Sequence, residues 1–136
     1  MATKQQLTGM QGVYFVAAEL SKRGFIVSPT SRGAFGADLL VTDQLCNRSY
    51  SVQVKTNART FTFWLLNKKS KDLVSKTHIY VLVNIRRDNK IEYFIVPSKV
   101  IAENMQEDEK GNFPSFSLEQ AIIYKDQWKY FGDPAG

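Results

Sequence analysis

The chain has 136 residues, 43% of them hydrophobic, with 18 Lys and Arg against 13 Asp and Glu and a formal net charge of +5. This length and composition predict one soluble globular domain over residues 1–136, and they exclude a disordered chain and a two-domain protein. No apolar run is long enough to cross a bilayer, and the N-terminus lacks the layout of a signal peptide, so we expect a cytoplasmic protein that does not associate with a membrane. The single Cys46 excludes internal disulfides and zinc sites made of cysteines.

The predicted elements begin with a helix over residues 5–23, in which apolar residues recur at helical spacing and after which Gly24 is a suitable stop. Strand-like runs then alternate with polar turns, and two helical segments close the chain. In chain order these elements are strands at 25–27, 37–42, 49–56, 61–66, 78–85 and 91–96, a helix at 98–105 and a helical tail at 118–131. Trp128 and Phe131 in that tail are expected to seal one edge of the core. This order predicts an α+β or mixed α/β domain.

The runs 37–42 and 49–56 carry the clearest pattern. A hairpin centred between Leu45 and Cys46 pairs Asp38 with Gln53 on one face. The other face is then wholly apolar, and its pairs are Ala37 with Val54, Leu39 with Val52 and Val41 with Tyr50. A slip of one residue would mix the two faces, so the pattern itself favours this register.

This register has a chemical consequence. Because side chains alternate along a strand, Gln53 and Lys55 would share the face of Asp38, with opposed Cβ atoms about 4.5–5.5 Å apart. The oxygens of a carboxylate and an amide suit a hard divalent cation, and a cation with a lysine can neutralise a phosphate in its transition state. The alternative interpretation is a polar face of a half-exposed sheet with a surface ion pair worth ~0–1 kcal/mol.

Three stretches of the chain are similar to one known family. The helix end ELSKRGFIV, the run GADLLV and the run YSVQVKT together resemble the PD-(D/E)xK phosphodiesterase superfamily, which has the restriction-endonuclease-like fold and includes archaeal Holliday-junction resolvases. The later runs IYVLVNI and EYFIVPSKV resemble a branch of small members, here with a Q-x-K variant of the motif. The resemblance implies a restriction-endonuclease-like core, in which a helix is followed by a central mixed β-sheet flanked by helices.

The resemblance also implies roles for residues. Asp38 would be the principal metal ligand, Gln53 would occupy the second acidic position, and the Val54 carbonyl would be a further ligand. Lys55 would orient or help deprotonate the attacking water. The implied cofactor is Mg²⁺, with Mn²⁺ as a substitute, and the implied product is cleaved nucleic acid. Gln53 departs from the family pattern, because an amide oxygen can bind Mg²⁺ but brings no negative charge, so metal affinity should fall.

Glu19 is the one acid in the predicted helix, and it has two interpretations. The family often carries a helix acid, so Glu19 could reach the metal through a bound water. Alternatively it forms a surface pair with Lys22 or Arg23, three and four residues further along the helix. The second interpretation is favoured.

Basic residues near the motif are candidates for nucleic-acid binding, since a net charge of +5 favours polyanions. Arg32 lies in a glycine-containing loop before Asp38. An arginine there could bind phosphate, or the segment could be a plain connecting loop. Three further basic residues follow Lys55, namely Arg59, Lys68 and Lys69. They could extend a basic track along nucleic acid or form an ordinary solvated surface.

The aromatic run 61–66 and the lone His78 also have two interpretations each. Phe61, Phe63 and Trp64 could stack on unpaired bases, but core packing is favoured. His78 begins an apolar strand without a visible partner, so a capping or half-buried structural role is favoured over a ligand or general base.

The leading hypothesis is a Mg²⁺-dependent endonuclease-like phosphodiesterase that acts on DNA, with a homodimer as one assembly. A second hypothesis is the same fold with a weakened metal site, which binds nucleic acid without cutting it. A third is a protein-interaction subunit of a defence or mobile-element system. Gln53 separates the first hypothesis from the second.

Overall fold

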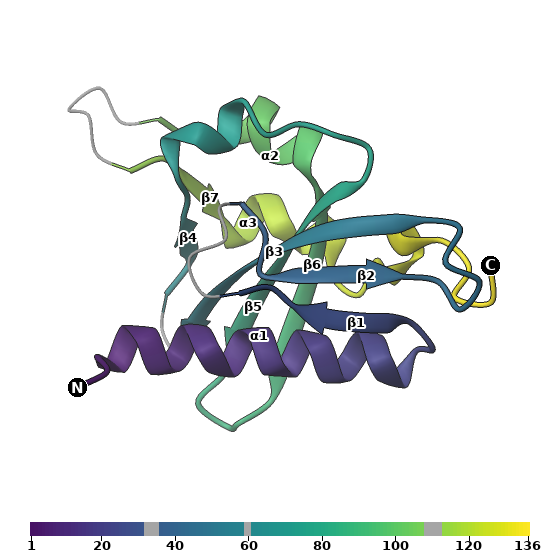
Figure 1. The fold of residues 1–136 in the computed structure, drawn as a ribbon. Helices are drawn as coiled ribbons and strands as arrows, with labels where there is room; N and C mark the ends of the chain where they lie inside the picture. Colours follow the sequence, from purple (N-terminus) through teal and green to yellow (C-terminus); the bar gives the residue numbers. More distant parts are fainter. Residues whose placement is uncertain (32–35, 59–60, 108–112) are drawn as a thin grey trace.

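The computed structural model describes residues 1–31, 36–58, 61–107 and 113–136 (Figure 1). Its helices and strands follow the predicted order except for one additional strand, β7, and short 3₁₀ helices lie between them. The elements are α1 (Lys4–Lys22), β1 (Ile26–Pro29), β2 (Leu39–Thr42), β3 (Ser49–Ala58), β4 (Phe63–Leu65), η1 (Lys68–Lys71), β5 (His78–Ile85), β6 (Ile91–Pro97), α2 (Ser98–Asn104), β7 (Ser115–Ser117), α3 (Leu118–Ala121), η2 (Ile122–Tyr124) and η3 (Trp128–Phe131).

A five-stranded mixed sheet forms the centre of the fold, with the strand order β1-β2-β3-β5-β6. Neighbouring strands are antiparallel except β3 and β5, which are parallel and require a crossover between them. That crossover contains β4 and η1, and β4 pairs with β7 in a separate two-stranded sheet. The predicted mixed α/β architecture is therefore confirmed.

Helix α1 covers one face of the central sheet (Figure 1). It starts with a capping box, in which Thr3 and Gln6 satisfy each other's backbone N–H groups, and the chain turns at Gly24 with φ 100°. Its inward residues Val16 and Leu20 are fully buried against strand residues of β2, β3 and β5. The outward residues Leu7, Met10 and Tyr14 are exposed.

Close contact between α1 and the sheet depends on Gly12. A Cβ at this position would overlap the Thr56 side chain on β3. Any larger residue would therefore push the helix away from the strand, whereas Gly9, one turn earlier, has open space around it. Gly12 thus sets how closely α1 approaches β3.

The opposite face of the sheet carries a second apolar cluster. It lies under β4, β7, α2 and α3, and its buried members are Trp64, Leu66, Tyr80, Leu82, Phe94, Val96, Ile101, Phe116 and Ala121. The sheet is thus the middle layer between α1 and a mixed layer of short elements (Figure 1).

The C-terminal tail differs from the prediction. The expected helix over 118–131 is broken into α3, η2 and η3, because Lys125 is extended and bridges to Phe94 while Asp126 has φ 56°. The packing role of the tail is confirmed, since Trp128 is 7% exposed and Phe131 is fully buried.

Two other expectations need adjustment. The strand expected at 61–66 is shorter, and it pairs outside the central sheet. The strand expected at 25–27 is shifted to Ile26–Pro29. Among the described residues, no helix is both long and apolar enough to cross a bilayer.

Candidate active site

The β2–β3 hairpin has the predicted register. Leu39 pairs with Val52, and the ladder continues to Thr42 with Ser49. The turn is organised by Asp43, whose buried carboxylate accepts the backbone N–H groups of Leu45, Asn47 and Arg48 at 2.9, 3.2 and 2.7 Å. Burial acts to raise the pKa of Asp43, but these donors outweigh it, so the pKa lies below its ordinary value. The turn therefore fixes the register from its own residues.

At Asp38 the chain leaves the regular ladder. The Asp38 N–H donates to the Val52 carbonyl at 2.7 Å, although the partner of Val52 in the ladder is Leu39. The Asp38 carboxylate then accepts the Val54 N–H at 2.8 Å and the Gln53 side-chain amide at 3.0 Å, both at Oδ2. The predicted Ala37–Val54 pair is therefore wrong, because the Asp38 side chain occupies that N–H. The predicted meeting of Asp38 and Gln53 is confirmed.

Gln53 and Lys55 lie on the sheet face opposite α1. Val52 and Val54 pack in the cluster that contains the α1 residues, so the alternate residues of β3 point to the other side. The parallel pairing places Gln53 beside Tyr80 and Lys55 beside Leu82. The predicted shared face of the motif residues is thus present.

Burial perturbs both charged groups. It raises the pKa of Asp38, against the Val54 N–H and the Lys55 charge, which lower it. Burial lowers the pKa of Lys55, against the Asp38 charge, which raises it. The two groups form no ion pair within 4 Å in the described structure, so their attraction only partly offsets the burial of each charge. Such pairs of perturbed groups are typical of reactive sites.

Solved structures that are similar to the chain over most of its length include one from an archaeon and one from a bacterium. One is Hjc, a Holliday junction resolvase from the archaeal hyperthermophile Archaeoglobus fulgidus, with a TM-score of 0.58 over 85% of this chain and 88% of that chain at 14% identity. The other is the bacterial homing endonuclease I-Ssp6803I, with a TM-score of 0.59 over 94% and 90% at 14% identity. No protein-family model and no curated protein sequence matches the chain. The chain has the restriction-endonuclease-like fold.

The implied cofactor Mg²⁺ requires oxygen ligands, and several oxygen atoms lie near Asp38. Asp38 Oδ1 and Gln53 Oε1 have no hydrogen bond from any described residue. The N–H and C=O of one residue point to the same side of a strand, so the Val54 carbonyl faces the edge where Asp38 lies. By type, these oxygens fit a hard cation. Only one of these three oxygens belongs to a carboxylate, so we expect the site to bind Mg²⁺ weakly. Among the described residues, no group of three His, Cys, Asp or Glu side chains could hold a metal ion.

Glu19 is not part of this oxygen cluster. Its carboxylate pairs with Arg23 at 3.2 Å, and its helix covers the other face of the restriction-endonuclease-like sheet. The surface-pair interpretation is therefore confirmed, with Arg23 rather than Lys22 as the partner.

The basic candidates are only partly described. Arg32 and Arg59 lie outside the described residues. Lys68 and Lys69 are exposed on η1, in the crossover between the parallel strands of the restriction-endonuclease-like core. In the same 3₁₀ helix Lys71 pairs with Glu107 at 3.1 Å.

The aromatic run divides between core and surface. Trp64 is 2% exposed, and its indole N–H donates to the Val83 carbonyl at 3.0 Å. Phe61 and Phe63 are 57% and 41% exposed, so the favoured core interpretation is wrong for these two. Alternation along β4 explains the difference between Trp64 and Phe63.

His78 has a partner that sequence patterns do not reveal. The parallel pairing places it beside Ser51, whose Oγ lies 2.7 Å from the His78 ring Nδ1. Burial lowers the pKa of His78, while a hydrogen bond to the Ser51 backbone acts to raise it. Ser51 is on the face of Gln53 and Lys55, so this pair adjoins the site. His78 is buried with this partner, and the structural role expected for it stays a prediction.

Proposed function

We propose that this protein is a metal-dependent nuclease-like phosphodiesterase that acts on DNA. The observation that carries the proposal is the Asp38 carboxylate, held by Val54 and Gln53 with Lys55 on the same face of the sheet. Two of the structural neighbours, by their names, are a Holliday junction resolvase and a homing endonuclease. The net charge of +5 favours a polyanionic substrate.

In this proposal, Asp38, Gln53 and the Val54 carbonyl hold Mg²⁺ or Mn²⁺, which when bound supplies positive charge at the scissile phosphate. Lys55 orients the attacking water and donates N–H to a phosphate oxygen. Because burial lowers its pKa, its neutral form is more accessible than that of an exposed lysine, so its Nζ can also hold a proton from the water. The water oxygen bonds to phosphorus, the P–O bond to the leaving oxygen breaks, and a proton ends on that oxygen.

The test is a plasmid-nicking assay with Mn²⁺ and Mg²⁺ on the wild type, Lys55→Ala and Asp38→Asn. We expect both variants to lose roughly 100-fold or more in rate. Lys90→Ala is the matched control, since Lys90 is an exposed lysine in the turn between β5 and β6, and it should nick like the wild type. Nicking that persists in both site variants would refute the mechanism.

A nuclease-fold binding module with weak or no catalysis is the second candidate function. The observation that favours it is Gln53, whose amide donates to Asp38 and leaves the site with one carboxylate. A gel shift of DNA at low salt, without nicking in either metal, would favour this candidate. A homodimer would bring two such centres to one substrate, and light scattering with and without DNA measures that assembly.

A further inference from the structure

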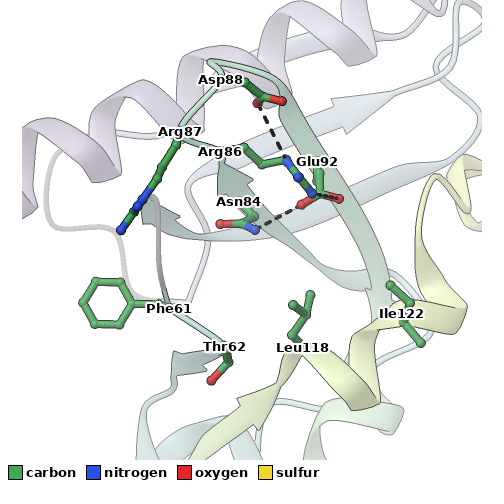
Figure 2. Close-up of a pocket in the computed structure, with 9 residues that line it drawn as sticks. All are labelled: Phe61, Thr62, Asn84, Arg86, Arg87, Asp88, Glu92, Leu118 and Ile122. Atoms are coloured by element: carbon green, nitrogen blue, oxygen red, sulfur yellow. Dashed lines mark hydrogen bonds and ion pairs between the residues drawn. The ribbon is translucent and has the colours of Figure 1, made fainter.

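The surface is hollowed at the carboxyl ends of the parallel strands β3 and β5, away from Asp38. The hollow has a volume of about 490 Å³, within the roughly 300–1,000 Å³ of ligand sites. Its walls come from the turn between β5 and β6, from the Phe61–Thr62 segment before β4, and from Leu118 and Ile122 (Figure 2).

Asn84 lies at the base of this hollow with one half of its amide unused. It is 7% exposed, and its Nδ2 donates to Glu92 Oε1 at 3.1 Å. Its Oδ1 is buried and accepts no hydrogen bond in the described structure. Buried acceptors are nearly always paired, so this oxygen requires a donor that the described residues do not provide. Figure 2 shows it on the side away from Glu92, toward Phe61 and Arg87.

Glu92 fixes the orientation of that amide. Burial acts to raise the pKa of Glu92, but the Lys125 and Asn84 hydrogen bonds outweigh it, and the pKa is lowered. An ionised carboxylate only accepts hydrogen bonds, so the Asn84 NH₂ group must face Glu92 and its oxygen must face the hollow. Lys125 at 3.0 Å and Arg86 at 3.6 Å hold Glu92 in place.

Phe61 and Arg87 form the opposite wall (Figure 2). Phe61 is 57% exposed, and its ring meets Phe63 edge to face at a centroid distance of 6.4 Å, so the Phe61 ring is supported but accessible. Arg87 is exposed and makes no ion pair within 4 Å in the described part of the chain, whereas Arg86 pairs with Asp88 and Glu92. The hollow thus offers an aromatic face, a free cation and a buried acceptor.

We propose that this hollow binds one unpaired nucleobase with its phosphate. The base stacks near Phe61 and Arg87 binds the phosphate. Because Asn84 Oδ1 is buried, the exposed side chains at the rim of the hollow must move aside before a base N–H group donates to it. Every base carries an N–H donor on its pairing edge, and in a duplex that donor is taken by the opposite base. The hollow therefore selects nucleotides outside a duplex.

The inference rests on the proposed nucleic-acid function for its source of bases. It adds a substrate feature, an unpaired nucleotide near the cut. Asn57 pairs with Asn84 in the ladder and is two residues after Lys55, or about 7 Å along the strand. A base in the hollow would thus lie near the catalytic face of the same sheet.

The experiment measures fluorescence anisotropy with three labelled DNAs: a duplex, the same duplex with a one-nucleotide bulge, and one with an abasic bulge. We expect the bulge with a base to bind roughly 5- to 100-fold more tightly than the abasic bulge. Phe61→Ala and Asn84→Leu should abolish this preference. Lys90→Ala and Phe113→Ala should keep it, since they remove an exposed cation of the same turn and an exposed aromatic ring outside the hollow. Thermal melts establish that each variant is folded.

A second arm titrates free deoxynucleoside monophosphates and follows the Asn84 side-chain amide by NMR. Equal affinity for the base and abasic bulges would overturn the inference and leave the proposed function standing. If DNA does not bind but free nucleotides shift the Asn84 signal, the hollow binds free nucleotides. That outcome would support the inference and refute the proposed function. Absence of both DNA binding and the Asn84 shift would overturn the inference.

Discussion

The Gln53 amide donates to the same Asp38 oxygen that accepts the Val54 N–H, at 3.0 and 2.8 Å. An amide at position 53 therefore stabilises the Asp38 carboxylate in the absence of a cation. A carboxylate at this position would bind a cation better, but it would repel Asp38 when none is bound. In the proposed metal site, Gln53 would thus lower the metal affinity and stabilise the metal-free state.

Gln53→Glu should reverse both effects. The metal-free variant should melt below the wild type, because two half-buried carboxylates repel each other. Added Mn²⁺ should raise its melting temperature more than that of the wild type, since tighter binding to the folded state stabilises it. Gln53→Met, which removes both the hydrogen bond and the oxygen, is the control. Equal metal-induced shifts in wild type and Gln53→Glu would contradict metal binding at this position.

Asp38→Ala and Asp38→Asn should separate stability from activity. The alanine variant leaves the Val54 N–H without its acceptor, so urea unfolding should show a loss of about 1–3 kcal/mol. The asparagine variant retains an acceptor oxygen and should lose about 1 kcal/mol less. Nicking should be lost in both. If the two variants are equally stable, the Asp38–Val54 hydrogen bond has no structural role.

The protein should become less stable as the pH falls through the range where His78 titrates. The pKa of His78 in the folded state lies below its ordinary 6.5, so the unfolded chain binds the proton more tightly. Its contribution to stability is full above pH 6.5 and is lost as the pH falls toward the folded-state pKa. His78 is the one histidine of the chain, so its NMR titration is unambiguous. His78→Gln should remove this pH dependence, and an unchanged slope would contradict the assignment.

Asp43→Asn should lower the melting temperature and weaken the β2–β3 turn. The Asp43 carboxylate accepts three backbone N–H groups, and a neutral amide would accept them less strongly. The folded-state pKa of Asp43 is below its ordinary 3.8, so its contribution is full above that value. In the wild type it is lost as the pH falls through the lowered pKa. Melts from pH 7 to pH 2 measure this, and the variant should lose less stability in acid than the wild type.

Gly12→Ala and Gly9→Ala form a matched pair within α1. Gly9→Ala should stabilise the protein by about 0.5–1 kcal/mol, because alanine favours the helix and nothing lies within 4 Å. Gly12→Ala should destabilise it by about 1–3 kcal/mol, because its Cβ meets Thr56. Thr56→Ala in the Gly12→Ala background should restore part of the loss. Similar unfolding energies for the two glycine variants would contradict the contact.

The hairpin could be predicted because its information is local. Alternation over 37–42 and 49–56 predicts the register that the structure has, and this register puts Gln53 and Lys55 on one face. The departure at Asp38 could not be predicted, because a side chain there replaces a backbone acceptor. The Ser51–His78 pair depends on parallel pairing across a crossover, and short patterns carry no register for such pairs.

The hollow cannot be predicted from the sequence for a similar reason. An aromatic run favours core packing for Phe61, and Asn84 lies within an apolar run, so neither position indicates a site. The composition of the tail permits one helix, whereas a backbone β-bridge to Phe94 interrupts the helix at Lys125. Burial of Trp128 and Phe131 was predicted correctly, because it follows from hydrophobicity alone.

Cys46 lies in the exposed turn that joins the two motif strands, with φ 58°, and it is the one thiol of the chain. A maleimide fluorophore would attach there without a new cysteine. The dye would sit at the end of the hairpin away from Asp38, on the order of 20 Å along the strands. Energy transfer between this dye and a labelled oligonucleotide would report the direction in which a bound DNA strand crosses the β-sheet.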